Sequence, residues 1–217
     1  MMQDEIERYW REIALLVHAM PGAVVARAAE MLDDCRARGG TVFIAGNGGS
    51  AATASHFACD LVKGTRLPGL RPFRVVPLTD NMPLVTAWAN DTSYERIFAE
   101  QLEPLVRPGD VLVAISASGN SPNILAAARV ARRAGAVTVA LTGRTGGKLR
   151  RLADLAVCVP SETIEQVEDA HLIVAHSLCV ALRQHLRDAA ARPPGTHRPG
   201  APPRRRRPRL SRARYAA

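Results

Sequence analysis

The segment TVFIAGNGGS, residues 41–50, contains an unbroken apolar run followed directly by a glycine-rich loop. A run that is apolar at every position predicts a strand buried on both faces, which is typical of a parallel sheet. In open parallel sheets, ligands bind where a loop leaves the carboxyl end of a strand and enters a helix. The segment therefore predicts an α/β protein with a binding site at this edge of its sheet.

Similar apolar runs continue along the chain at residues 74–78, 111–115, 137–141 and 155–159. Helices are expected between them, most clearly at residues 49–62, 93–106, 122–134 and 163–186. Residues 3–38 are predicted to form two helices separated at Pro21-Gly22. Strands that alternate with helices require right-handed crossovers. The pattern predicts a doubly wound five-stranded parallel sheet of the flavodoxin-like type, with helices on both faces and a helical segment before it.

The positive charge of the chain is concentrated at its C-terminal end. The net charge is +9, and residues 192–217 contain nine arginines and no acidic residue, so the preceding residues are formally neutral. This terminal segment also contains six prolines and few apolar side chains, which is typical of disorder. We expect a domain at residues 1–190 and a disordered basic tail at 191–217. No nucleic-acid partner is expected except through that tail, for which a solvated extension with no binding role is the favoured alternative.

The remaining bulk features predict a cytoplasmic protein. No apolar run approaches the roughly 18 residues that would span a membrane, and the first residues, MMQDEIERYW, do not resemble a signal peptide. The four cysteines form no CxxC pair, and we interpret them as reduced thiols. No membrane partner is expected.

A second polar loop, SASGNSP at residues 116–122, follows the strand expected at 111–115. Ser121 is a typical N-cap residue and Pro122 a typical first helical residue, so free backbone N–H groups are expected there. Three serine hydroxyls surround the same helix N-terminus. The loop predicts a phosphate site made without lysine or metal.

The first loop also fits a loose dinucleotide fingerprint, Gly46-x-Gly48-x-x-Ala51. That interpretation needs an acidic residue about 20 residues further on. The nearest candidate, Asp80, lies 34 positions after Gly46. A dinucleotide site is therefore disfavoured.

Six motifs occur together in a recognisable order. They are GNGGS at 46–50, HFA at 56–58, AND at 89–91, SASGNS at 116–121, LTGRTGGK at 141–148, and the pair His171 and His176. Over residues 5–187 the chain resembles the phosphoheptose isomerases, the sedoheptulose 7-phosphate isomerase branch of the sugar isomerase (SIS) family. The resemblance implies a homotetrameric SIS fold, one Zn²⁺ per subunit, and aldose–ketose isomerisation of a sugar phosphate to D-glycero-D-manno-heptose 7-phosphate.

The resemblance also implies a set of site residues. The acid–base pair is expected at Asp60 and His176, and the metal ligands at His56, Asp60, Glu168 and His176. Substrate contacts are expected from Asn47, Gly48, Gly49, Ser50, Asn90, Asp91, Ser116, Ala117, Ser118, Ser121 and Glu168. The family usually has Glu at position 60 and Gln at position 168, and residues 61–66 also depart from its pattern. These differences leave open a non-catalytic SIS module that binds a sugar phosphate or a protein partner.

Helical spacing constrains the expected metal site. His56 and Asp60 are four residues apart, so one helix places both on the same face. Glu168 and His176 are eight residues apart, which a regular helix separates by about 12 Å. Both can reach one ion only if the helix is irregular or other elements intervene. His171 is expected to be structural.

Overall fold

The computed structural model describes residues 1–191, and within them the chain forms a three-layer α/β fold. The strands are β1 (Thr41–Ala45), β2 (Arg74–Pro77), β3 (Val111–Ser116), β4 (Val137–Thr142) and β5 (Leu155–Cys158). All are parallel, in the order β2-β1-β3-β4-β5. The predicted doubly wound parallel sheet is confirmed.

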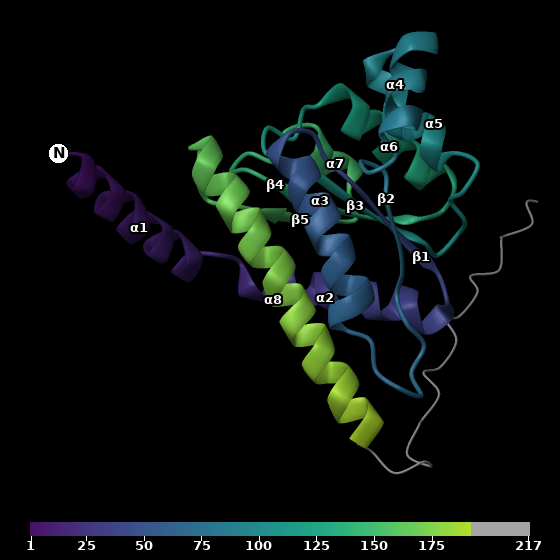
Figure 1. The fold of residues 1–217 in the computed structure, drawn as a ribbon, viewed down its shortest axis with the longest axis horizontal. Helices are drawn as coiled ribbons and strands as arrows, with labels where there is room; N and C mark the ends of the chain where they lie inside the picture. Colours follow the sequence, from purple (N-terminus) through teal and green to yellow (C-terminus); the bar gives the residue numbers. More distant parts are fainter. Residues whose placement is uncertain (192–217) are drawn as a thin grey trace, which may run out of the picture.

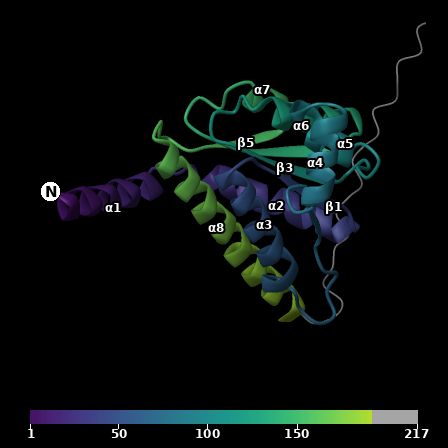
Figure 2. The ribbon, with the colours of Figure 1, turned by 45° about the horizontal axis from the view of Figure 1, so that its top comes forward.

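Helices cover both faces of the sheet, as Figures 1 and 2 show. One face packs against α2 (Gly22–Arg38), α3 (Gly49–Cys59) and α8 (Ile164–Ala191). The other packs against α5 (Ile97–Leu102) and α6 (Pro122–Arg133), with α4 (Met82–Asp91) and the short α7 (Leu149–Leu152) beside them. Because β1, β3 and β4 are covered on both sides, nearly all of their residues are buried, which explains their unbroken apolar sequence.

The first helix, α1 (Met2–His18), projects away from the body of the molecule (Figures 1 and 2). Tyr9 anchors it by donating a hydrogen bond to Asp169 of α8 at 2.6 Å. Burial of the Tyr9 hydroxyl, together with the hydrogen bond to the negatively charged Asp169, raises the pKa of Tyr9 to about 12. Trp10 and Leu15, in contrast, are 65% and 70% exposed. The helix thus presents apolar side chains that the described chain leaves uncovered.

Two helical predictions differ in detail from the structure, and one helix was not predicted. The helix expected at 49–62 is α-helical only to Cys59 and continues as a π-helix, η1 (Asp60–Gly64). The helix expected at 93–106 is a 3₁₀ turn, η2 (Tyr94–Arg96), followed by the short α5. Helix α4 was not predicted, although Asn81 caps it by accepting a hydrogen bond from the Leu84 N–H and Pro83 lies in its first turn.

The C-terminal helix α8 extends to Ala191, one residue beyond the expected domain boundary. The predicted disordered tail otherwise lies outside the described residues. Within residues 1–191, no single helix meets the length and hydropathy expected of a membrane span; the pair α1 and α2 does so only when joined across a 69° bend.

Candidate functional site

The loop after β3 is held rigidly at the N-terminus of α6. Ser121 is the N-cap residue and Pro122 the first helical residue, as predicted. The Ser121 side chain makes no capping bond; its Oγ lies 2.9 Å from the Oγ of Ser116. Ser118 Oγ accepts a hydrogen bond from the Asn120 N–H at 3.1 Å. The three serines expected around the helix N-terminus therefore gather there, with positive dipole and hydroxyl donors suited to a phosphate.

The loop after β4 supports the serine loop at residues 116–122, which together with the N-terminus of α6 is called the phosphate cradle below. The Gly143 N–H donates to the Ala117 carbonyl at 2.8 Å, and the Leu149 N–H donates to the Gly119 carbonyl at 2.9 Å. Gly119 has a φ of +64°, and a Cβ there would lie 2.2 Å from the Gly146 carbonyl oxygen. Only glycine fits such a close backbone approach. The LTGRTGGK motif thus serves as a support for the serine loop.

The loop after β1 is joined to the serine loop by a pair of amides. Asn47 and Asn123 each donate an Nδ2–H to the other's Oδ1 at 2.9 Å. The Tyr94 hydroxyl also donates to Asn47 Oδ1 at 3.1 Å. The pair ties together the two loops that the sequence singled out, although Asn123 and Tyr94 were not predicted. Asn123 is 1% exposed, a property that only the structure shows.

Other expected substrate contacts surround the same edge of the sheet. Gly46, Asn47 and Gly48 line a hollow of about 440 Å³ that also meets Ala89 of α4. Asn90 and Asp91 follow at the end of α4, where Asn90 Nδ2 donates to Asp91 Oδ1 at 2.8 Å. Ser50 is buried in the first turn of α3. Of these expected contacts, Asn47 and Gly48 line the hollow, and Asn90 and Asp91 directly follow its lining residue Ala89.

Three of the four expected metal ligands meet between α3, η1 and α8. His56 Nε2 lies 3.5 Å from Asp60 Oδ2, and His176 Nε2 lies 3.6 Å from the same oxygen. The two Nε2 atoms are 3.2 Å apart. One ligand atom from each residue lies within 4.8 Å of the others. Two imidazoles and one carboxylate with an open side fit the donors that catalytic Zn²⁺ prefers.

Glu168 does not join this group. Helix α8 is unbroken from Ile164 to Ala191, so Glu168 lies two turns before His176. Its carboxylate instead lies against the first turn of α3: a Cβ on Gly49 would come 2.5 Å from Glu168 Oε2. The carboxylate therefore faces the positive end of α3, and Gly49 leaves it room. This position is beside the predicted substrate loop, at a distance from the histidines.

His171 faces the interior, as expected for a structural residue. It is 1% exposed, and neither ring nitrogen has a hydrogen-bond partner among the described residues. Burial lowers its pKa to about 4, while the Thr142 backbone partly opposes the shift without reaching hydrogen-bonding geometry. The residue is therefore neutral at pH 7, with no place in the His56–Asp60–His176 group.

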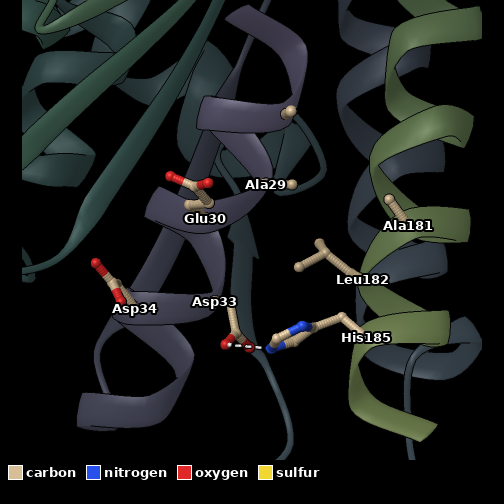
Figure 3. A pocket seen from close by; sticks show the side chains of 8 residues that line it. Ala29, Glu30, Asp33, Asp34, Ala181, Leu182 and His185 are labelled. Atoms are coloured by element: carbon tan, nitrogen blue, oxygen red, sulfur yellow. Dashed lines mark ion pairs between the residues drawn. The ribbon is translucent and has the colours of Figure 1, made fainter. Parts of the chain in front are cut away.

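A hollow of about 500 Å³ between α2 and α8 lies away from all these residues (Figure 3). Its lining includes Glu30, Asp33 and Asp34, and His185 Nε2 lies 3.4 Å from Asp33 Oδ2. Three carboxylates would repel a phosphate dianion. The cradle at the strand ends, which carries hydroxyls and a helix N-terminus, is the better phosphate site.

Comparison with known proteins agrees with this geometry. Residues 8–143 match the model of the SIS domain family. The chain is 42% identical to the phosphoheptose isomerase of Trichlorobacter lovleyi over 76% of its own length and 83% of the relative's. It is 39% identical to that of Roseiflexus sp. over 84% and 92%. The structure of phosphoheptose isomerase GmhA from Neisseria gonorrhoeae superposes with a TM-score of 0.79 at 30% identity, covering 85% of this chain and 100% of that one.

The matches to the two isomerases and to the solved structure extend over most of both chains, and the family-model match at residues 8–143 includes both strand-end loops and α3, which carries His56. The predicted fold and family are thereby confirmed. The chain belongs to the SIS domain family and, within it, to the phosphoheptose isomerases.

Proposed function

We propose that the protein isomerises sedoheptulose 7-phosphate to D-glycero-D-manno-heptose 7-phosphate. The observation that carries the proposal is the convergence of Asp60 with two histidines on helices that begin beside the phosphate cradle. A non-catalytic sugar-phosphate module would need only the cradle. The additional acid–base group and the isomerase relatives favour an enzyme.

The chemistry assigns distinct roles to the two parts of the site. The serine loop and the α6 N-terminus hold the phosphate, which anchors the substrate and orients its far end. Asp60 removes a proton from C1 of the ketose while His176 donates one to the C2 oxygen, giving an enediol. Loss of the O1 proton and return of a proton to C2 then give the aldose. The reaction moves hydrogens without any net oxidation.

We propose Zn²⁺ as the cofactor, one ion per subunit, held by His56, Asp60 and His176. Bound there, zinc would supply a positive charge that stabilises the oxygens of the enediol. Glu168 was expected as a fourth ligand, but its position at Gly49 favours a contact with substrate hydroxyls instead. Elemental analysis of wild type, Glu168→Gln and His56→Ala tests this division: we expect Glu168→Gln to retain zinc and His56→Ala to lose it.

We further propose that the protein is a homotetramer in the cytoplasm. The exposed Ile6, Trp10 and Leu15 on the projecting α1 support an assembly in which another subunit covers them. Cys35, Cys59, Cys158 and Cys179 are free thiols, which fits a reducing compartment. Light scattering on the intact chain and on a variant lacking residues 1–18 tests the assembly: we expect a tetramer and a smaller species.

The decisive test is direct. Zinc-loaded protein is incubated with sedoheptulose 7-phosphate, and formation of the aldose phosphate is followed. We expect turnover in wild type and none in His176→Ala. Absence of aldose with every divalent ion supplied would refute the proposal and favour a binding role.

A further inference from the structure

The structure assigns a positioning role to Thr65, which lies outside the residues expected at the site. We infer that its hydroxyl fixes the π-helical turn η1 and thereby holds the carboxylate of Asp60 between His56 and His176. This inference rests on the proposed metal site, but it is independent of which sugar phosphate the enzyme uses. Three observations about η1 carry it.

The first observation is where the helix changes its hydrogen-bonding pattern. Helix α3 is regular to Cys59, and η1 begins at Asp60 itself. Aspartate has a short side chain, so the position of its carboxylate follows the backbone closely. His56 is in the regular helix before the change. The angle between the His56 and Asp60 side chains therefore depends on how the turn after Asp60 is held.

The second observation is how the turn ends. A π-helix pairs each carbonyl with the N–H five residues on, so the change from α to π geometry leaves a carbonyl without its usual donor. Thr65 Oγ1 donates to the Leu61 carbonyl at 2.6 Å, in a buried position. The Lys63 carbonyl of the same turn accepts a hydrogen bond from the Arg66 N–H at 3.5 Å. The hydroxyl therefore gives the Leu61 carbonyl, inside η1, a buried side-chain donor.

The third observation is how η1 meets the opposite histidine. Leu61 is fully buried in the same apolar cluster as Leu178 and Cys179 of α8, which lie within one turn of His176. Fixing the Leu61 carbonyl thus fixes the contact between the Asp60 turn and the His176 turn.

Metal affinity provides a test that does not require turnover. Zn²⁺ is titrated calorimetrically into the metal-free full-length protein. We expect Thr65→Val, which keeps the shape but lacks the hydroxyl, to weaken zinc binding about tenfold or more, as changes beside metal ligands generally do. Thr65→Ser should restore the affinity. A matched control is Ser177→Ala, which removes a hydroxyl-to-carbonyl bond of the same kind, to Ile173, on α8; it should bind zinc like wild type.

Kinetics separate positioning from general stability. With sedoheptulose 7-phosphate, Thr65→Val should lower kcat while KM changes less than twofold, because the phosphate cradle is formed by other elements. Zinc affinity equal to wild type in Thr65→Val would overturn the inference. So would loss of folding in that variant, since the hydroxyl would then serve stability alone. If wild type binds zinc but does not isomerise the sugar, the proposed function fails while the inference about Thr65 stands.

Discussion

At the scale of the residue, the arrangement of Asp60 between His56 and His176 is the central feature. Its Oδ2 lies almost equally far from the two Nε2 atoms, so one carboxylate contacts both imidazoles. The carboxylate is also the proposed base. Its charge and its proton affinity therefore affect both metal binding and proton transfer.

A neutral replacement of Asp60 tests both roles. Asp60→Asn keeps the shape but removes the base and the negative charge, so we expect turnover to fall by about 10³-fold or more, within the range of general base catalysis, and zinc content to fall sharply. Elemental analysis and aldose formation are measured together. The control Asp188→Asn makes the same chemical change far from the site and should alter neither zinc content nor turnover. Full activity in Asp60→Asn would show that Asp60 is not the base.

His171 predicts a specific sensitivity to acid. Its folded pKa is about 4 against an ordinary 6.5, so between these values the unfolded chain binds more protons than the folded protein. Stability conferred by the neutral imidazole is complete above pH 6.5 and is lost as the pH falls toward 4, by about 3 kcal/mol at most. Urea unfolding across this range should show a smaller pH dependence for His171→Leu. An unchanged slope would contradict the assignment.

Sequence reasoning located some of these residues and missed others for physical reasons. His56 and Asp60 are four residues apart on one helix, so their proximity follows from helical geometry. The approach of His176 depends on how α8 packs against α3, and only the family resemblance pointed to it. Asn123 and Tyr94 act through pairing with Asn47, which no local pattern predicts. The eight-residue spacing between Glu168 and His176 already indicated that both could not easily reach one ion, and the unbroken helix α8 keeps them two turns apart.

At the scale of the element, the serine loop and α6 form one anion-binding unit. Ser118→Ala combined with Ser121→Ala removes two hydroxyls near the helix N-terminus, and we expect KM for the sugar phosphate to rise about tenfold with zinc content unchanged. Calorimetry with the sugar phosphate provides the measurement. Ser177→Ala on α8 is the matched loss of a hydroxyl. Unchanged affinity in the double variant would place the phosphate elsewhere.

The elements also differ in how well the sequence predicts them. The strands were predicted closely because burial on both faces leaves an unbroken apolar run. The end of α3 was not, because a π turn has no distinct composition and depends on the Thr65 hydroxyl meeting the Leu61 carbonyl. Asn81 and Pro83 signal the start of helix α4, but its sequence lacks a strong apolar face, so the helix was not predicted.

At the scale of the whole molecule, the site and the core are complete before the basic segment begins. All residues of the proposed site precede Ser177, and the last buried core residue of α8 is Leu186. A protein that ends at Ala191 should therefore unfold within about 2 °C of the full chain and keep its isomerase rate. Thermal unfolding and turnover of the two proteins are compared side by side. A lower rate in the shortened protein would give residues 192–217 a role in the reaction.

The strand order has a consequence for synthesis on the ribosome. The interior strand β1 pairs with β2 on one side and β3 on the other, and both emerge from the ribosome after it. Val42 of β1 pairs with Val111 of β3, so this side of β1 cannot form its backbone hydrogen bonds until residue 111 has been synthesised. Until then the apolar segment 41–45 and the glycine-rich loop emerge without their native cover, a condition in which nascent chains aggregate. Yield in a cell should therefore depend on chaperones that shield the first hundred residues.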